Sequence, residues 1–181
     1  MKKAIRSVLS VSAAGIMLIA VAACGSALDP RGPAITLKAN EVVTFSENEA
    51  GGSENGWWDA ESVGNWSQSD RPVLNLKYDD TFKNGMNIIL SVSGFVVEKN
   101  PNISVSIRAN EEFLKKIEFN LGKPGEEVAL SVSKEILSKK KGIVTLAFEI
   151  TNAAVPNDVG YNSDLRKLGI LLRQIIATPA G

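Results

Sequence analysis

Five short runs of this sequence alternate apolar and polar residues with a period of two, and this alternation constrains the fold more than any other feature. The runs are Val73–Tyr78, Ile89–Phe95, Ile103–Ile107, Val128–Val132 and Val144–Ile150. A period of two places successive side chains on opposite faces of a strand, and the β-branched residues of these runs favour strands. Turn-forming residues separate the runs, roughly every ten to fifteen residues, as in sandwich proteins. The pattern predicts an all-β fold, an antiparallel β-sandwich of jelly-roll type with at most one short helix.

A single helix and a closing strand complete the expected elements. Residues Lys134–Ser138 are expected to form a short helix, because Ser133 is a residue type that caps helix N-termini. The apolar run Leu168–Ile176 is expected to be the central strand that closes the sandwich, and a helix is the alternative there. Two charged pairs, Glu111–Glu112 and Lys115–Lys116, flank a strand and are typical of a protected sheet edge.

The beginning of the chain has a composition of its own. Lys2, Lys3 and Arg6 precede an apolar stretch at residues 8–23, and Cys24, the only cysteine, follows it. A basic head, a short apolar middle and small residues at the end are the parts of a secretory signal peptide. A membrane-spanning helix is the alternative, but these 16 residues are fewer than the ~20 that a spanning helix needs.

The run Val21-Ala22-Ala23-Cys24 is similar to the lipobox of bacterial lipoproteins, in which the cysteine is acylated before cleavage. This resemblance implies a signal peptide at residues 1–23, a lipidated tether at 24–34 and a β-sandwich domain at 35–178. It also implies that the lipid on Cys24 holds the protein on a membrane of the cell envelope, since two or more acyl chains anchor a protein stably. No Asp follows Cys24, which by enterobacterial sorting rules favours the outer membrane over the inner membrane.

The composition excludes several classes of function. Removal of residues 1–23, which contain three basic and no acidic side chains, leaves 158 residues with 17 basic and 20 acidic ones. This acidic balance, with no basic cluster beyond Lys139–Lys141, argues against nucleic acid as a partner. The chain has no histidine and, once Cys24 is acylated, no thiol, which excludes histidine-dependent nucleophiles and thiol chemistry. No catalytic residue, metal ligand or cofactor is predicted, and the protein is expected not to be an enzyme.

Two segments depart from simple alternation, and they contain the residues of greatest functional interest. The first, Gly56–Ser67, holds all three tryptophans of the chain. The second, Asn157–Ile170, leads into the last predicted strand. The first contains the pattern G-W-x-x-x-E-x-x-G-x-W-S and the second contains D-x-R-x-L-G-I.

These patterns resemble those of a β-sandwich accessory domain found with periplasmic phosphoglycerol transferases and with proteins of surface-polysaccharide synthesis. The residues that match are Gly56, Trp57, Glu61, Gly64, Trp66, Ser67, Asp164, Arg166, Leu168, Gly169 and Ile170. The resemblance spans about residues 35–177 and implies a stand-alone relative of that domain in a sugar-related context. It carries no catalytic residues.

A sugar-binding set of side chains is predicted from the two segments. Indole rings stack on the C–H faces of sugars, and charged groups bind their hydroxyls, provided that the two segments meet in space. Trp57 is expected to be the more exposed of two adjacent indoles, and Trp66 to be packed inside. A structural role is the alternative, with Arg166 in a partly buried ion pair with Glu61 that joins the segments. The candidate ligand-binding residues are Trp57, Trp58, Glu61, Trp66, Asn162, Asp164 and Arg166.

The sequence therefore predicts an envelope lipoprotein that binds a carbohydrate or surface glycan without catalysis. The alternative is a structural or scaffolding lipoprotein that binds a protein partner in an envelope assembly through a sheet face or edge. Two further alternatives stay open. Glu61 and Asp164 have the chemistry of a glycosidase pair, and Asp79–Asp80, or Asn157–Asp158 with Asp164, have oxygen ligands suited to calcium.

Overall fold

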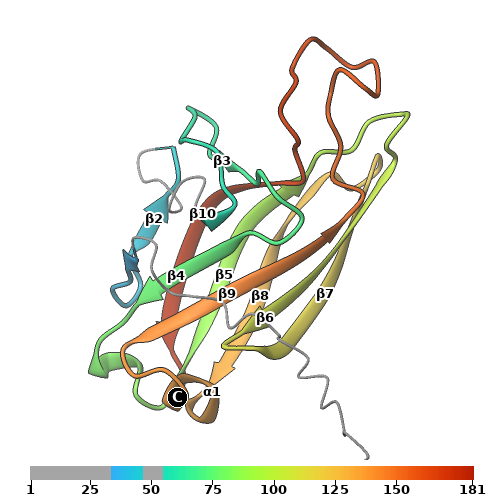
Figure 1. Ribbon diagram of the computed structural model, residues 1–181. Helices are drawn as coiled ribbons and strands as arrows, with labels where there is room; N and C mark the ends of the chain where they lie inside the picture. The colour runs from blue at the N-terminus through green and yellow to red at the C-terminus, as the bar shows by residue number, and fades with distance from the viewer. Residues whose placement is uncertain (1–33, 47–54) are drawn as a thin grey trace, which may run out of the picture.

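The computed structural model describes residues 34–46 and 55–181, which form two β-sheets packed face to face (Figure 1). The strand order of the first sheet is β1 (Ile35–Thr36), β4 (Val73–Lys77), β9 (Ile143–Thr151), β6 (Asn102–Ala109) and β7 (Glu112–Asn120). The order of the second sheet is β2 (Val42–Thr44), β10 (Ile170–Pro179), β5 (Gly85–Gly94) and β8 (Gly125–Ser133), and β3 (Asn65–Trp66) also pairs with β10.

The antiparallel pairs of the main strands are nested along the sequence. β6 pairs with β7, β5 with β8, β4 with β9, and both β2 and β3 with β10. One long folded hairpin that is wound into two sheets pairs in this way, and this winding is the jelly roll. The predicted all-β sandwich of jelly-roll type is confirmed, although one pair, β1 with β4, is parallel.

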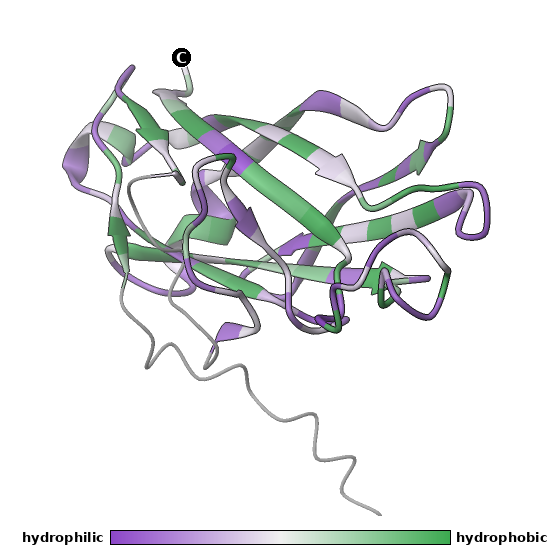
Figure 2. Ribbon diagram, turned by 90° about the horizontal axis from the view of Figure 1, so that it is seen from above, coloured by the Kyte–Doolittle hydropathy of each residue, from purple (hydrophilic) through white to green (hydrophobic). Residues whose placement is uncertain are grey.

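The core is the layer of apolar side chains between the two sheets. Buried residues alternate with half-buried ones along β6 and with exposed ones along β8, as the predicted period of two requires. Figure 2 shows this alternation as green and purple bands along the strands. Each of the five alternating runs lies in a strand to within one residue at its end, and most of the run that was expected to close the sandwich lies in β10, between β2 and β5. Lys115 and Lys116 lie within the edge strand β7 rather than beside a strand.

The predicted helix is confirmed as α1 (Lys134–Ser138). The Ser133 hydroxyl accepts a hydrogen bond from the Ile136 backbone N–H at 3.4 Å, as expected of an N-cap. Leu137 is buried, and its carbonyl accepts a hydrogen bond from the Tyr78 hydroxyl at 3.0 Å. The helix therefore closes the end of the sandwich at which β4 ends, beside the short 3-10 helix η2 (Asp80–Phe82).

The two ends of the sandwich carry different connections. α1 and the C-terminus lie at one end, and the connection that contains β3, the β5–β6 connection and the long β9–β10 loop lie at the other (Figure 1). We call the second end the loop end. No helix among the described residues is long and apolar enough to cross a membrane. Cys24, the predicted signal peptide and most of the predicted tether lie outside the described residues.

Trp57 is part of the core rather than of the surface. Its side chain is 0% exposed, and its ring meets the Phe148 ring edge-on at a centroid distance of 5.8 Å. Its indole N–H donates to the Val73 carbonyl at 2.8 Å. The expectation that Trp57 is the more exposed of the adjacent indoles is wrong, because its backbone bridge to Ser67 turns this ring inward, while Trp58 is left half-buried.

Replacement of Trp57 by alanine is expected to lower the free energy of unfolding by about 3–5 kcal/mol, because it leaves a cavity in the core. The matched control is Phe113→Ala, which removes a ring that is 55% exposed on β7 and should cost less than about 1 kcal/mol. Urea unfolding, monitored by far-ultraviolet circular dichroism of the backbone, measures both losses without using tryptophan fluorescence. Equal losses for the two variants would contradict the assignment of Trp57 to the core.

Candidate functional site

The tryptophan-rich segment folds into a small hairpin attached to the second sheet. Backbone bridges join Trp57 to Ser67 and Glu61 to Gly64, and the returning arm contains β3, which pairs with β10. Gly64 has a φ of +129°, and a Cβ atom there would lie 2.4 Å from the Leu172 carbonyl oxygen. The hairpin therefore lies directly on the backbone of β10, and only glycine fits at this crossing.

The β9–β10 loop is fixed by its own polar side chains. Ala154 and Leu168 exchange two backbone hydrogen bonds of 2.9 Å that close the neck of the loop. Farther out, the Asn162 side-chain oxygen accepts from the Asp164 N–H at 2.8 Å, and the Asp164 carboxylate accepts from the Arg166 N–H at 2.9 Å. These are successive Asx turns, in which a side chain replaces a backbone partner. The loop thus has a defined shape without a helix or strand.

The two segments meet in a close contact between their patterned residues. The Ser67 hydroxyl accepts from the Ile170 N–H at 2.9 Å, and the Ser67 N–H donates to the Ile170 carbonyl at 2.8 Å. A Cβ atom on Gly169 would lie 2.6 Å from the Ser67 hydroxyl oxygen. Ser67, which ends the first pattern, can therefore form these hydrogen bonds to Ile170 only because Gly169 of the second pattern has no side chain.

Arg166 makes the second connection between the segments. Its Nε and Nη2 donate to the Asp164 carboxylate at 2.8–3.2 Å, and its Nη1 donates to Glu61 of the hairpin. The Trp58 ring lies 5.8 Å from the guanidinium carbon, and the Trp58 indole N–H donates to the Lys167 carbonyl at 3.1 Å. The ion pair predicted between Arg166 and Glu61 is confirmed.

These contacts hold both groups in their charged forms. Hydrogen bonds from the Arg166 side chain and then from its backbone N–H lower the pKa of Asp164 below its ordinary value of 3.8. Hydrogen bonds to Asp164 and then to Glu61 raise the pKa of Arg166. Both shifts favour the charged forms of the pair.

A pocket of about 330 Å³ lies at the loop end beside this ion pair. We call it the loop pocket. Its polar wall consists of Glu61, Asn162, Asp164 and Arg166, and its aromatic wall consists of Trp66, Phe95 and Tyr161. Its volume is near the lower end of the ~300–1,000 Å³ that is typical of small-ligand sites.

The three rings of the aromatic wall form a chain of edge-to-face contacts. Trp66 and Phe95 lie 6.2 Å apart, and Phe95 and Tyr161 lie 5.7 Å apart, between ring centroids. Phe95 is buried and its N–H donates to the Gly169 carbonyl at 2.8 Å, whereas Tyr161 is 63% exposed. The chain thus runs from the core to a tyrosine ring that faces solvent at the mouth of the pocket.

Five of the seven candidate residues predicted from sequence line the loop pocket, namely Glu61, Trp66, Asn162, Asp164 and Arg166. The other two do not. Trp57 is sealed in the core, so that it has no surface with which to touch a ligand. Trp58 is half-buried and packs on Arg166 from outside the pocket wall. Trp66, expected inside, is half-buried against the core.

Sequence reasoning missed Tyr161 and Phe95 as wall residues. Phe95 ends an alternating run and therefore looks like an ordinary core residue. Tyr161 had a detectable signal, since it is the only aromatic residue of the second segment and stands between Gly160 and Asn162 in a loop. Clustering of tryptophans drew attention to the other segment instead.

Within residues 34–46 and 55–181, no group of three or more His, Cys, Asp or Glu side chains is placed to hold a metal ion. Two of the acidic residues considered for calcium, Asp79 and Asp164, have other partners. Asp79 accepts a hydrogen bond from the Thr81 N–H at 2.9 Å and caps η2, and Asp164 binds Arg166. Both carboxylates stabilise local structure in these positions.

Neither a protein-family model nor a curated protein matches the sequence. Among solved structures, the chain is similar to the CBM36-1 domain of a multidomain xylanase from the hindgut metagenome of Trinervitermes trinervoides, with a TM-score of 0.47 and 11% identity over 78% of this chain and 98% of that one. It is also similar to the carbohydrate-binding module CBM36 in complex with calcium and xylotriose, with a TM-score of 0.41 and 13% identity over 76% and 99% of the two chains. The insecticidal delta-endotoxin Cry8Ea1 from Bacillus thuringiensis has a TM-score of 0.40 and 10% identity over 65% of this chain and 20% of that one. Since the TM-scores are below 0.5, function has to be judged from the pocket itself.

The Asp164–Arg166 pair gives a testable dependence of stability on pH. Because the pKa of Asp164 is lowered in the folded state, its charge stabilises the fold above its ordinary pKa of 3.8, and this contribution disappears as the pH falls through the lower folded value. The difference in unfolding free energy between wild type and Asp164→Asn should therefore be constant from about pH 7 to pH 5 and shrink below about pH 4.

Urea unfolding at a series of pH values measures this difference. Asp59→Asn is the matched control, since Asp59 is an exposed carboxylate of the hairpin that has no ion-pair partner in the described part of the chain. A difference for Asp164→Asn that stays unchanged down to about pH 2, or that closes already near pH 5, would contradict the ion-paired state of Asp164.

Proposed function

We propose that the loop pocket binds a neutral carbohydrate without catalysis. The single observation that carries this proposal is the placement of the exposed Tyr161 ring beside a rigid set of charged and amide groups in one pocket. A sugar ring has apolar C–H faces and a polar edge of hydroxyls, and an aromatic ring next to fixed hydrogen-bonding groups is complementary to both.

The hydrogen-bonding groups of the pocket wall have capacity to spare. A guanidinium has five N–H groups, and Asp164 and Glu61 use three of those of Arg166, which leaves one N–H on Nη1 and one on Nη2. The second oxygen of Glu61, the Asn162 amide N–H group and the Tyr161 hydroxyl have no partner in the described ranges of the chain. Spare donors and acceptors so close together suit neighbouring hydroxyls of one sugar.

The charge of the pocket favours neutral over anionic sugars. Glu61 and Asp164 are negative, and Arg166 alone is positive, so the wall has one net negative charge. Both carboxylates already bind the guanidinium, which leaves no unpaired cation in the wall for a phosphate or a uronate. An anionic ligand would meet a like charge that costs binding energy without a compensating ion pair.

The same ion pairs argue against hydrolysis at this site. A glycosidase needs one carboxyl group that stays protonated near neutral pH to act as general acid. Asp164 has the opposite property, since Arg166 lowers its pKa. Glu61 and Asp164 both point to the same guanidinium and are joined through it, so they do not flank an open space for a glycosidic bond.

The proposal includes an anchored location in the cell envelope. The lipobox-like sequence around Cys24 supports a lipoprotein, and the residue after Cys24 supports the outer membrane rather than the inner one. The patterns shared with the accessory domain of phosphoglycerol transferases support a context of envelope glycans. The second candidate function is that of a scaffolding lipoprotein, which would need a contiguous apolar patch to bind a protein partner. The exposed large apolar residues are instead spread over β2, the hairpin, β5, β7 and the loops of the loop end.

Tyr161→Ala is expected to weaken binding of a neutral saccharide about tenfold, or ~1.4 kcal/mol, through loss of the ring contact. Isothermal titration calorimetry of the full chain measures this, with methyl glycosides of glucose, galactose and N-acetylglucosamine and with methyl glucuronide as an anionic probe. At least one neutral glycoside should bind, and the glucuronide should bind more weakly than its neutral counterpart.

Two variants separate the ring contact from loss of structure. Tyr161→Phe keeps the ring and should retain most of the affinity. Phe113→Ala removes an exposed ring of β7, outside the pocket, and should leave the affinity for the saccharide unchanged. If no neutral glycoside binds, or if Tyr161→Ala binds as well as wild type, the proposed function is wrong.

The anchored location has a separate test in Cys24→Ser. Wild type, produced in a Gram-negative bacterium grown with an alkyne analogue of palmitate, should be labelled and sediment with membranes. The variant should lose the label, because the chain has no other cysteine. Ser26→Ala is the control and should behave as wild type. An unlabelled wild type, or a Cys24→Ser protein that is labelled as strongly as wild type, would contradict acylation at Cys24.

A further inference from the structure

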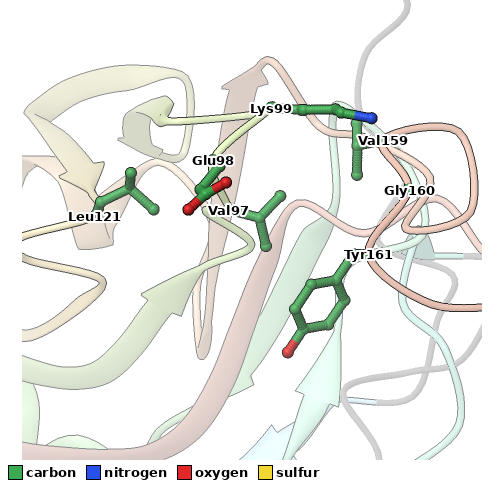
Figure 3. A pocket seen from close by; sticks show the side chains of 7 residues that line it. All are labelled: Val97, Glu98, Lys99, Leu121, Val159, Gly160 and Tyr161. Carbon is green, nitrogen blue, oxygen red and sulfur yellow. The ribbon is translucent and has the colours of Figure 1, made fainter.

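A second pocket, of about 420 Å³, adjoins the loop pocket (Figure 3). Val97 and Tyr161 line both pockets. A ligand that contacts Tyr161 in the loop pocket therefore has direct access to the second one. We call this second pocket the apolar pocket, because Val97, Leu121 and Val159 contribute three aliphatic side chains to its wall.

The two pockets differ in chemistry. The loop pocket contains Arg166, which forms ion pairs with two carboxylates. The charged side chains of the apolar pocket are Glu98 and Lys99, which are exposed and whose charges cancel. Gly160 has a φ of +68°, and the Lys99 ammonium lies 3.1 Å from the position that a Cβ atom would take there. Figure 3 shows the Lys99 side chain extended across this side of the pocket toward Val159. The charged side chains of this pocket are thus solvent-exposed and carry no net charge, beside three aliphatic side chains.

Leu121 is the residue of this pocket that the fold does not require. It stands in the β7–β8 turn, where the Asn120 side-chain oxygen fixes the geometry by accepting from the N–H groups of Gly122 and Lys123, each at 3.0 Å. Its own side chain is 52% exposed and lies outside the buried core. Val97 and Val159, from two other connections, pack against the core and complete an aliphatic surface with it.

We propose that the ligand is a glycoside with an aliphatic chain, whose sugar occupies the loop pocket and whose chain occupies the apolar pocket. This inference rests on the proposed function and adds the ligand class to it. The continuity of the two pockets through Val97 and Tyr161 supports one ligand that spans both. An aliphatic chain is the occupant that three aliphatic side chains with no buried polar partner would bind, since its burial removes apolar surface from water.

The test is a series of methyl, propyl and hexyl glycosides of whichever neutral sugar binds in the calorimetric experiment. The full chain is held in phospholipid nanodiscs with no free detergent, because the alkyl chain of a detergent would itself compete for the apolar pocket. Titration of empty nanodiscs corrects for partitioning of the glycosides into the lipid. Affinity should rise up to about fourfold for each methylene group that becomes fully buried, and the hexyl glycoside should bind at least tenfold more tightly than the methyl glycoside. Leu121→Ser should remove most of this gain and leave the affinity for the methyl glycoside unchanged.

Leu165→Ser is the matched control. Leu165 is 75% exposed at the same end of the sandwich and lines neither pocket, so its loss should leave the hexyl gain intact. Equal affinities for methyl and hexyl glycosides, or a hexyl gain that survives in Leu121→Ser, would overturn this inference while leaving the proposed function in place. Absence of binding by every glycoside would overturn both. Binding of 1-hexanol as tight as that of the hexyl glycoside would show an apolar site independent of sugar and would also overturn it.

Discussion

The guanidinium of Arg166 is the group on which the loop end depends. It binds Asp164 of its own loop and Glu61 of the hairpin, and the Trp58 ring packs on it. Glu61 and Arg166 are 105 residues apart in the sequence, so this one side chain, together with the Ser67–Ile170 hydrogen bonds, fixes the relation between two distant segments. Both carboxylates have this guanidinium as their ion-pair partner, so neither is left as an unpaired, partly buried charge. The shape of the loop pocket follows from that arrangement.

The two sequence patterns of the loop end now have a structural explanation. Gly64 crosses the backbone of β10, and Ser67 bonds to Ile170 in the space that Gly169 leaves free. These residues join the hairpin to the last strand and would be needed whatever the pocket binds. Of the three residues of the aromatic wall, Trp66 belongs to the first pattern, whereas Phe95 and Tyr161 stand outside both patterns. The two patterns therefore encode the junction and part of the pocket wall, and the exposed Tyr161 ring comes from outside them.

Local patterns predicted the sheets well because a period of two determines which side chains face inward without reference to distant contacts. The cap at Ser133 is local for the same reason, and α1 begins where it predicts. The prediction for Trp57 was wrong because the side-chain direction in an irregular hairpin depends on distant contacts. Here it is set by the bridge to Ser67 and by packing on Phe148, which lies 91 positions further along the chain. Tyr161 was missed because a loop side chain becomes part of a site only through what folds beside it.

The contacts that make the loop end rigid also make it suitable for binding. Asn162 and Asp164 use one oxygen each to shape the loop, and Arg166 uses three of its N–H groups to hold both carboxylates. The remaining donors and acceptors are therefore fixed in direction before a ligand arrives. Ordering a free arginine or asparagine costs about 0.5–1.5 kcal/mol per side chain on binding, and a wall that is already ordered avoids this cost. Structural and binding roles are thus compatible in the same residues, since the first is what gives the second its geometry.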